Sequence, residues 1–345
     1  MAPTIHDVAR LAEVSIKTVS NVLNDYPHIR PATRQRVLDA IEALGYTPNL
    51  TARGLRSGRT GLVSLVVPDL RNAYFAELAD AVVRAADARG LSVVIAQSGG
   101  ERERELDLLR GTGARMVDGI LFSALALGEQ DHDLLAAVRT PLVLLGERVL
   151  QGPTDHVTMR NTEGARAATE HLLAQGRRRL VALGTTTGPA PAAAALRLEG
   201  YRQALAGAGV PLDPDLVVGV DGWFRSTGAA ATREFLARGI PFDGVVAFND
   251  ALALGAMRVL QEAGLRIPAD VALIGFDDLD ETRYSLPTLS TIDPGRAEIA
   301  EVAVHHLQER IEAAGQPLPP RDHLTAFRLV VRESSAPVPA PAAGA

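Results

Sequence analysis

The segment TIHDVARLAEVSIKTVSNVLN, residues 4–24, contains two short helical patterns with a turn between them. Thr4 and Asp7 have the spacing of a capping box, so the sequence predicts a helix that begins after Thr4. Val8 and Leu11 then fall on one apolar face of that helix. A second cap and a second apolar face follow at Ser15, Val19, Val22 and Leu23. Two short helices joined by a tight turn form a helix-turn-helix.

A third helical pattern completes this small domain. Pro31 suits the first position of a helix, and Gly45 suits the position just after its C-terminal end. The apolar residues spaced for burial between them are Val37, Leu38, Ile41 and Leu44. We therefore predict an all-α headpiece of three helices over residues 1–48.

Lys17 is the one lysine of the chain, and it lies in the second helical pattern. Burial of the apolar face leaves the N-terminal part of this helix exposed, with Ile16, Lys17, Thr18, Ser20 and Asn21 at or near it. In a helix-turn-helix that part of the second helix contacts base edges in the major groove. Lysine can donate to guanine, asparagine can bond to adenine, and isoleucine can contact the thymine methyl group. The alternative is a solvated helix face on which a lysine has no specific role.

Charge is distributed unevenly along the chain. Residues 1–60 contain eight basic and five acidic side chains, a net charge of +3, whereas the whole chain carries −6, so residues 61–345 carry −9. A small basic segment on a larger acidic one is typical of a polyanion-binding module joined to a different domain.

The segment YTPNLTARGLRSGRT follows the headpiece. Asn49 can cap a short helix that ends at Gly58 and carries Arg53 and Leu55. A bland linker accounts for the glycine, serine and arginine residues. A leucine among arginines instead resembles the apolar wedge with which some proteins open a base step in the minor groove. We predict a hinge helix or linker over residues 49–60.

The segments TIHDVARLAEVSIKTVSNVLN, PATRQRVLDAIEALGYTPN and ARGLRSG together resemble the headpiece and hinge of the LacI family of bacterial transcription regulators. The motifs are dense, in order and correctly spaced. The resemblance implies a sequence-specific DNA-binding regulator and not an enzyme. It also implies a regulator, a repressor in the first place, that binds a palindromic operator as a homodimer and responds to a small-molecule effector. Activation of transcription stays open, because it depends on the position of the operator.

The resemblance also assigns expected DNA contacts. Its base-reading positions fall at Ile16, Lys17 and Asn21. Backbone or flanking contacts fall at Thr4, Ser15, Thr18, His28 and Arg34, and the hinge contacts are Arg53 and Leu55, the leucine that members insert at the operator centre. Gly54 stands where members usually have a better helix former, which implies a looser hinge.

From Leu62 onward, short β-rich runs alternate with helical stretches, as in α/β domains with parallel sheets. The runs are LVSLVV, SVVIAQ, DGILFS, LVLLG, RLVALG, GVVAFN and VALIGF. This region resembles the two-lobed, periplasmic-binding-protein-like core of the same family, in which the chain crosses between the lobes three times. The implied crossings lie near residues 159, 291 and 325, with lobe 1 over about 61–159 and 292–325, lobe 2 over about 160–291 and 326–335, and a disordered tail over 336–345.

Polar and aromatic residues follow several of the predicted strands, and ligands of such sheets bind beyond the C-terminal strand ends. The candidate effector contacts are Asp69, Tyr74, Phe75, Arg197, Trp223, Asn249 and Asp277. Sugars are held by an aromatic face and by Asp, Asn and Arg groups that bond to several hydroxyls. By resemblance, Arg197, Trp223, Asn249 and Asp277 match effector contacts of sugar-responsive members. The alternative for each alone is structural, with Trp223 in the core and Asp277 as a helix cap.

Two positions depart from the family pattern. Gly146 and Arg160 stand where many relatives have an aspartate. The stretch GPAPAAAAL before Arg197 lacks the Arg and Thr of purine-responsive relatives, so a nucleobase effector is less expected than a sugar or sugar derivative. Arg160 leaves an anionic sugar, such as a sugar phosphate, open.

Several other function classes find no support in the sequence. The chain has no Cys, no phosphate-binding GxxxxGK[ST] loop, no G-x-S-x-G elbow and no strand-linked G-x-G-x-x-G. His305 and His306 are adjacent, which is poor metal geometry, and the acidic run DDLDE lacks the spacing of a known cation loop. We expect no metal and no cofactor. A sugar-processing enzyme and an exported solute-binding protein are the competing interpretations.

The two ends of the chain complete the predictions. The N-terminus does not have the pattern of an export signal, and no apolar run reaches the length of a membrane span, so we predict a cytoplasmic protein with no membrane partner. The C-terminal residues SSAPVPAPAAGA are rich in Pro and Ala and have no leucine heptads, so we predict a dimer rather than a tetramer.

Overall fold

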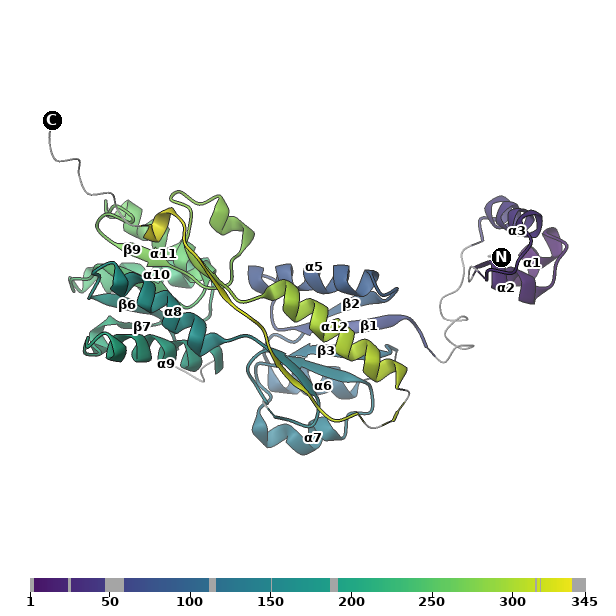
Figure 1. Cartoon of the computed structure of the whole chain (residues 1–345), viewed down its shortest axis with the longest axis horizontal. Coiled ribbons are helices and arrows are strands. Elements are labelled where there is room, and N and C mark those ends of the chain that lie inside the picture. The colour runs from purple at the N-terminus through teal and green to yellow at the C-terminus, as the bar shows by residue number, and fades with distance from the viewer. Residues whose placement is uncertain are drawn as a thin grey trace. The chain divides into compact units, whose positions relative to one another are not determined.

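The computed structural model describes residues 3–23, 26–46, 59–111, 116–149, 151–186, 192–313, 315–316 and 318–336. The chain divides into two compact units, residues 1–60 and residues 61–345 (Figure 1). The predicted hinge contacts Arg53 and Leu55, and the predicted tail from residue 337 onward, lie outside the described residues.

The first unit is the predicted all-α headpiece. Its helices are α1 (Ile5–Leu11), α2 (Ile16–Leu23) and α3 (Pro31–Leu44). The capping box is present, because Thr4 Oγ1 accepts from the Asp7 amide at 3.4 Å and Asp7 Oδ2 accepts from the Thr4 amide at 2.9 Å. Gly45 ends α3 in the left-handed region at φ +59°.

The core of the headpiece differs from the prediction at two leucines. Leu11 is 53% exposed and Leu38 is 44% exposed, so the prediction that they are buried is wrong. The helices meet through Val8, Val19, Val22 and Val37, and through small residues that the pattern did not mark, namely Ala9, Ala12 and Ala40. Alanines at these contacts let the helices approach closely, and the larger leucines then face solvent.

Lobe 1 of the second unit is built on a six-stranded parallel sheet in the order β11-β5-β4-β3-β1-β2. Its strands are β1 (Leu62–Val67), β2 (Ser92–Gln97), β3 (Gly119–Ser123), β4 (Leu142–Leu145), β5 (Asp155–Thr158) and β11 (Asp322–Leu324). Its helices are α5 (Ala73–Asp87), α6 (Arg102–Arg110), α7 (His132–Ala136), α12 (Arg296–Glu312) and the 3₁₀ turn η2 (Glu129–Asp131). Helix α12 packs on α5 and on β3, β4 and β5.

Lobe 2 repeats the pattern on a four-stranded parallel sheet in the order β7-β6-β8-β9. Its strands are β6 (Leu180–Thr185), β7 (Val217–Gly219), β8 (Gly244–Ala247) and β9 (Ala272–Ile274). Its helices are α8 (Asn161–Ala174), α9 (Ala192–Gly207), α10 (Arg225–Ala237) and α11 (Asp250–Glu262), with 3₁₀ turns η3 (Pro214–Leu216), η4 (Asp280–Arg283) and η5 (Glu333–Ser335). Each of the seven predicted strands is present.

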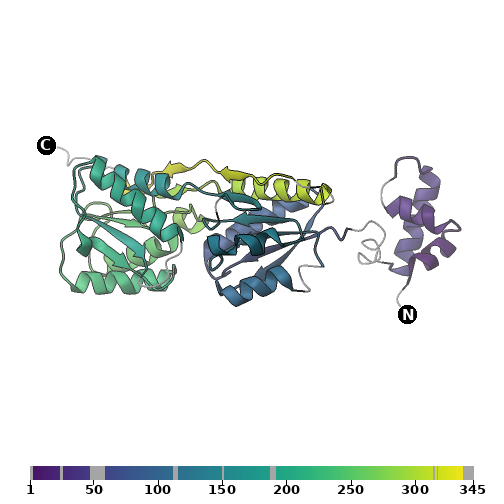
Figure 2. The same ribbon diagram turned by 90° about the horizontal axis from the view of Figure 1, so that it is seen from below.

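The chain passes between the lobes three times. It leaves lobe 1 after β5, returns through β10 (Thr291–Asp293), and leaves again between β11 and β12 (Arg328–Val330). Strands β10 and β12 pair antiparallel. Figure 2 shows the last passage running along the core from α12 toward lobe 2.

Glycines set the helix pairing in lobe 2. Helices α8 and α9 pack against each other, as do α10 and α11. A Cβ on Gly200 would lie 2.1 Å from the Thr162 carbonyl oxygen, and a Cβ on Gly255 would lie 2.1 Å from the Arg225 carbonyl oxygen. No other residue fits at these two crossings without moving a backbone.

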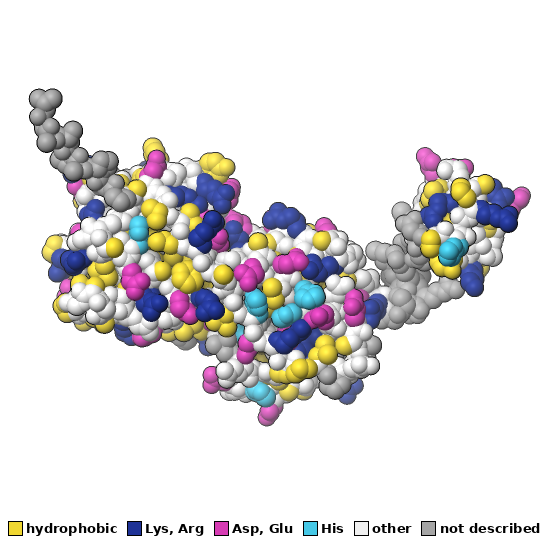
Figure 3. All heavy atoms as spheres, in the orientation of Figure 1, with side chains coloured by type: hydrophobic (Ala, Val, Ile, Leu, Met, Phe, Trp, Pro, Cys, Tyr) yellow, Lys and Arg dark blue, Asp and Glu magenta, His cyan; other side chains and the backbone are white. Residues whose placement is uncertain are grey.

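The surface of the core mixes charges of both signs. Figure 3 shows basic and acidic side chains interspersed over one face. Many form ion pairs within one turn of chain, such as Arg258 with Glu262 at 2.7 Å. Exposed pairs of this kind contribute little to stability. The net negative charge is therefore spread over this face rather than gathered in one acidic patch.

Candidate functional site

The exposed face of α2 carries the predicted base-reading side chains. Ile16 and Lys17 are exposed at the start of the helix, and Asn21 is half-buried one turn later. Ser15 caps the helix, since its Oγ accepts from the Thr18 amide at 3.1 Å. The structure therefore presents Ile16 and Lys17 from a capped helix N-terminus, with Asn21 in the second half of the helix.

The remaining predicted DNA contacts of the headpiece surround this helix in the fold. Thr4 caps α1 and is exposed, as is His28, whose ring packs edge-on against Tyr26 with centroids 5.5 Å apart. Arg34 of α3 donates from Nη2 to the Tyr26 carbonyl at 3.1 Å. These contacts tie Tyr26 to His28 and to α3.

A cavity of about 600 Å³ lies between the two lobes of the core. All seven predicted effector residues line it: Asp69, Tyr74, Phe75, Arg197, Trp223, Asn249 and Asp277. Asp69 follows β1, while Tyr74 and Phe75 begin α5, so lobe 1 supplies these three. The other four come from lobe 2. The rule that ligands bind beyond the C-terminal strand ends accounts for this convergence.

Arg197 is the buried centre of the polar lining. Its side chain is 3% exposed. Nε donates to Asn161 Oδ1 at 2.7 Å, Nη1 donates to the Phe248 carbonyl, and Nη2 lies 3.4 Å from Met159 Sδ. Its guanidinium also lies 3.7 Å from Asp277 Oδ1. Burial lowers the pKa of Arg197, and the nearby carboxylate of Asp277 opposes that shift.

Trp223 lines the cavity as the one tryptophan of the chain. Its Nε1 donates to the Gly184 carbonyl at 2.9 Å, and its ring packs edge-on against Phe248 with centroids 6.5 Å apart. The Arg197 guanidinium lies 5.0 Å from its ring centroid. Hydrogen bonding at one end and packing at another hold the indole in a fixed orientation.

Asp277 begins a loop of unusual backbone conformation, residues 277–280, which we call the Asp277 loop. Asp277 has φ +125°, and Asp278 has φ +49°. The amide of Asp277 donates to the Ile292 carbonyl at 2.8 Å. Burial raises the pKa of Asp277 well above its ordinary value, and Arg197 acts in the opposite direction.

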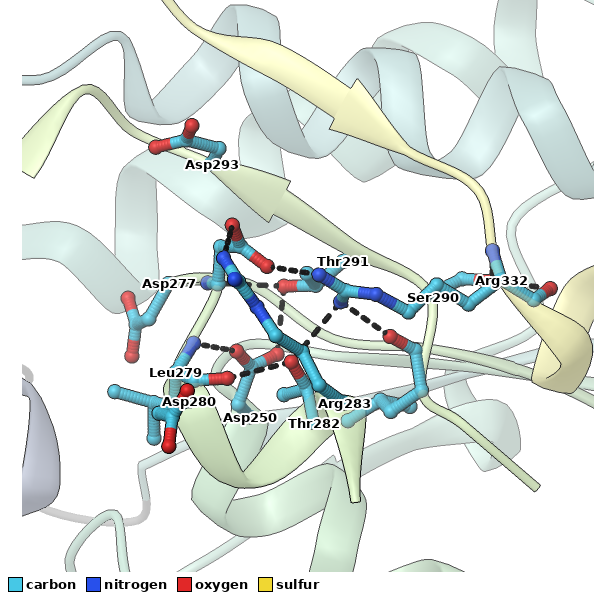
Figure 4. Close-up of polar contacts among 12 residues, drawn as sticks. Asp250, Asp277, Leu279, Asp280, Thr282, Arg283, Ser290, Thr291, Asp293 and Arg332 are labelled. Atoms are coloured by element: carbon cyan, nitrogen blue, oxygen red, sulfur yellow. Dashed lines mark hydrogen bonds and ion pairs between the residues drawn. The ribbon is translucent and has the colours of Figure 1, made fainter. Parts of the chain in front are cut away.

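Asp250, which does not line the cavity, holds this loop through hydrogen bonds. Its Oδ2 accepts from the Leu279 amide at 2.9 Å, and its Oδ1 accepts from Thr291 Oγ1 at 2.7 Å (Figure 4). Burial raises the pKa of Asp250 to about 7, against the effect of these two hydrogen bonds. Asn249, its neighbour, caps α11 by accepting from the Leu252 amide at 2.8 Å.

The sequence reasoning missed several residues of the lining. They include Arg71, Ser123, Glu147, Asp221 and Phe224. Glu147 Oε1 accepts from Asn161 Nδ2 at 2.8 Å, which joins lobe 1 to lobe 2. The Arg71 guanidinium of lobe 1 lies 5.5 Å from the ring centroid of Phe224 in lobe 2. Glu147 follows β4, so the rule that found the other residues applies to it as well.

The two departures from the family pattern lie in different places. Gly146 lines the cavity with φ +98°, and its carbonyl accepts from His156 Nε2 at 2.5 Å. Arg160 is absent from the lining, is 41% exposed, and pairs with Glu163 at 3.2 Å. The structure therefore gives the anionic-sugar interpretation no basis in Arg160.

The described residues offer neither a metal site nor a membrane-spanning helix. Within the described part of the chain, no group of three or more His, Asp or Glu side chains could hold a metal ion. None of the described helices is both long and apolar enough to cross a membrane.

Two family descriptions match the chain. "Bacterial regulatory proteins, lacI family" matches residues 4–49, and "Periplasmic binding protein-like domain" matches residues 169–335. The transcriptional regulator CelR of Thermobifida fusca is 36% identical over 343 residues, covering 96% of this chain and 98% of the relative.

Solved structures agree with these matches. A LacI-family protein from Sanguibacter keddieii is 49% identical with a TM-score of 0.74, over 80% of this chain and 99% of that one. A regulator CelR in complex with cellobiose is 32% identical with a TM-score of 0.70, over 96% and 99%. The Lac repressor dimer bound to operator and an anti-inducer is 27% identical with a TM-score of 0.82, over 97% and 99%.

Proposed function

Since this chain belongs to the lacI family of bacterial regulatory proteins and is a DNA-binding regulator of transcription, we propose that it is a repressor controlled by a neutral sugar bound in the cavity of its core. The observation that carries the proposal is the convergence of seven predicted effector residues, from both lobes, on one cavity. In this proposal residues 1–48 bind DNA, residues 49–60 link the headpiece to the core, and residues 61–335 bind the effector and the second subunit.

The proposed DNA contacts centre on α2. Ile16 and Lys17 are exposed in its first turn, where the side chains of a recognition helix reach base edges. In this proposal Thr4, Ser15 and Thr18 contact the DNA backbone beside these base-reading residues. Two headpieces bind the two half-sites of a palindromic operator. One relative has been solved as a dimer on its operator.

The lining of the cavity favours a polyhydroxylated ligand. Trp223 and Phe224 offer aromatic surface to the apolar face of a sugar ring. The described carboxylates of the lining are Asp69, Glu147, Asp221 and Asp277, against the guanidinium groups of Arg71 and Arg197. Carboxylates accept hydrogen bonds from the hydroxyl groups of a sugar. The side-chain amide of Asn249, which also lines the cavity, can both donate and accept.

Charge argues against an anionic sugar. Arg71 forms an ion pair with Asp69 at 2.7 Å. In Arg197, the atoms Nε, Nη1 and Nη2 each have an acceptor in the protein. A phosphate in the cavity would therefore meet carboxylates without a free arginine to offset them. A neutral mono- or disaccharide avoids this cost, and a relative binds cellobiose.

Exposed apolar side chains support a homodimer. Val94 and Ile95 on the edge strand β2 are 47% and 41% exposed, and Tyr284 and Leu286 in lobe 2 are 79% and 81% exposed. Large apolar side chains at this exposure mark interaction surfaces when they gather in patches. Lobe 1 and lobe 2 each offer one such pair to a second subunit.

Ligand binding is the test of this proposal. The purified protein is titrated with cellobiose, other neutral mono- and disaccharides, sugar phosphates and nucleobases. Trp223 is the only tryptophan and lines the cavity, so its intrinsic fluorescence reports occupancy of the site. A ligand that binds the folded state also raises the melting temperature with its concentration.

We expect a neutral sugar to change the fluorescence and raise the melting temperature with the same dissociation constant. Asp277→Asn and Arg197→Lys should lower its affinity, whereas Arg258→Gln on the exposed face of α11 should not. A response to sugar phosphates alone, or to no sugar in the panel, would contradict the effector assignment and leave the DNA-binding function intact.

A further inference from the structure

Two side chains of lobe 1 hold the Asp277 loop of lobe 2. Glu77 lies in α5, and Arg296 is the first residue of α12. Arg296 Nη1 donates to the Asp277 carbonyl at 2.7 Å, and Nη2 donates to the Asp278 carbonyl at 3.3 Å. Arg296 also forms an ion pair with Glu77, whose Oε1 accepts from the Asp280 amide at 3.0 Å. Four polar contacts thus join α5, α12 and the loop.

The conformation of the loop produces the acceptor for this arginine. Asp277 and Asp278 both have positive φ angles, +125° and +49°, in a region that non-glycine residues rarely adopt. Such residues persist where the surrounding structure holds them, and they concentrate at ligand-binding segments. Here two successive carbonyls accept from one guanidinium. A relaxed backbone would not offer the same pair of acceptors to Arg296.

Lobe 2 holds the same loop independently. Asp278 Oδ1 accepts from Arg332 Nη2 at 2.6 Å, and Asp278 Oδ2 lies 3.4 Å from Arg283 Nη2. Asp250 and Thr291 hold the adjoining amides. The loop therefore keeps its place in lobe 2 when the contacts from lobe 1 are removed. Loss of those contacts removes one of the ties between the lobes rather than unfolding the loop.

Glu77 and Arg296 are well placed to transmit force between the lobes. Their side chains are 28% and 18% exposed, so solvent screens the ion pair only partly. Arg296 begins a helix that packs on three strands of the lobe 1 sheet. A displacement of the Asp277 loop is therefore passed to a rigid element of lobe 1.

We propose that Glu77 and Arg296 form an interlobe clamp that sets the width of the effector cavity. The inference rests on the proposed function, because it takes the cavity to be the effector site. Asp277 contributes its side chain to the cavity and its carbonyl to the clamp, so ligand binding and lobe spacing meet in one residue. Neither Glu77 nor Arg296 lines the cavity, which makes both of them positioning residues.

The test measures the spacing of the lobes directly. The chain has no cysteine, so two introduced cysteines take spin labels without background. Glu103→Cys on α6 and Ala230→Cys on α10 place exposed labels on helices that begin beside the cavity lining, one in each lobe. Double electron–electron resonance then gives the distance between the labels in the full-length, ligand-free protein.

A matched control removes a similar ion pair from the same helices. Arg89, just after α5, pairs with Glu301 of α12 and is 18% exposed, as Arg296 is. That pair lies wholly within lobe 1. The variants compared are Arg296→Met, Glu77→Gln and the control Arg89→Met, each in the labelled background.

In Arg296→Met and Glu77→Gln we expect the mean distance between the labels to increase by more than about 2 Å, the scale of rearrangements in hinged complexes. In the control Arg89→Met we expect this distance to stay at the parental value. Unchanged distances in both clamp variants, with a parental circular dichroism spectrum, would overturn the clamp. An equal increase in Arg89→Met would do the same, because it indicates general loosening of lobe 1. The label distances are measured without ligand, so they test the clamp even if no sugar binds. The clamp and the sugar-effector proposal can therefore be contradicted independently of each other.

Discussion

At the scale of single residues, the cavity lining contains a buried charge whose nitrogen atoms each have a partner in the protein. Arg197 is almost fully buried, and Asn161, Phe248 and Met159 surround its guanidinium with acceptors. A buried charge without partners is costly, whereas one held by acceptors of fixed geometry keeps its position without that cost. Burial raises the pKa of two neighbouring carboxyl groups, Asp250 and Asp277, whereas their polar partners act in the opposite direction.

Asp250 leads to a prediction about pH. Its pKa is raised from 3.8 to about 7 by burial, so between these values the folded protein keeps a proton that the unfolded chain has lost. The free energy of unfolding therefore falls as pH rises through this range. Asp250→Asn retains an acceptor for the Leu279 amide and does not titrate. We expect its melting temperature, measured by calorimetry from acid to neutral pH, to fall less steeply than that of the parental protein. Parallel curves would mean that Asp250 is ionised in the folded state.

At the scale of elements, lobe 2 depends on two close helix crossings made by glycine. Gly200 brings α9 onto α8, and Gly255 brings α11 onto α10. Because α11 begins at Asn249 and Asp250, the second crossing also fixes the distance of the cavity lining from the lobe 2 sheet. The packing of α11 on α10 therefore also affects the geometry of the binding site.

Gly255→Ala should be strongly destabilising. The added Cβ would lie 2.1 Å from the Arg225 carbonyl oxygen, so α10 and α11 must separate. Overpacking of this kind costs about 1–3 kcal/mol or more. Gly207→Ala is the control, since its Cβ would meet nothing within 4 Å. It should be neutral or stabilising by up to about 1 kcal/mol. Urea unfolding measures both, and equal midpoints for the two variants would contradict the crossing.

Long apolar strands were predictable from the sequence, and short polar ones were not. LVSLVV and SVVIAQ coincide with β1 and β2, because β-branched residues favour strands both in the largely buried β1 and in the more exposed edge strand β2. The strand β5 reads DHVT and resembles a loop, yet all four of its residues are buried. Asp155 is tolerated there because Arg310 and Arg321 bond to its carboxylate, and those residues lie far along the chain.

The candidate effector site also has parts that the sequence predicts and parts that only the folded chain reveals. Side chains that follow predicted strands could be placed in one cavity, because parallel strands share an edge. The contact of Glu77 with Arg296 joins positions 219 residues apart, and nothing in either local segment indicates it. The positive φ angles of Asp277 and Asp278 also have no signal in the sequence, since neither position is a glycine. Contacts between elements distant in sequence, and strain held by tertiary structure, require the folded chain.

At the scale of the whole molecule, the core exposes apolar side chains in both lobes, which the second subunit of the proposed dimer would cover. The most exposed of these side chains are Tyr284 and Leu286, which follow the short helix η4. In lobe 1 the edge strand β2 presents Val94 and Ile95. A subunit contact that uses both pairs would respond to any change in the spacing of the lobes.

Leu286→Glu should therefore weaken the proposed dimer. Loss of an apolar anchor from the centre of an interface costs about 2 kcal/mol or more, which is over tenfold in the dissociation constant. Sedimentation velocity over a concentration series measures this. Leu212→Glu, at a leucine 40% exposed elsewhere in lobe 2, is the control. A dimer of unchanged affinity would remove Leu286 from the interface, and a tetramer of the parental protein would contradict the predicted oligomeric state.

The three passages between the lobes have a consequence for how such a protein can change over generations. Sheet strands of lobe 1 come from residues 62–158 and again from 322–324, so neither lobe is one continuous stretch of the gene. A single recombination event near residue 60 exchanges the complete headpiece, whereas no single event exchanges one lobe without cutting the other. The target sequence on DNA can thus be acquired as a cassette. A new ligand must be acquired by point substitution in the cavity or by replacement of the entire core.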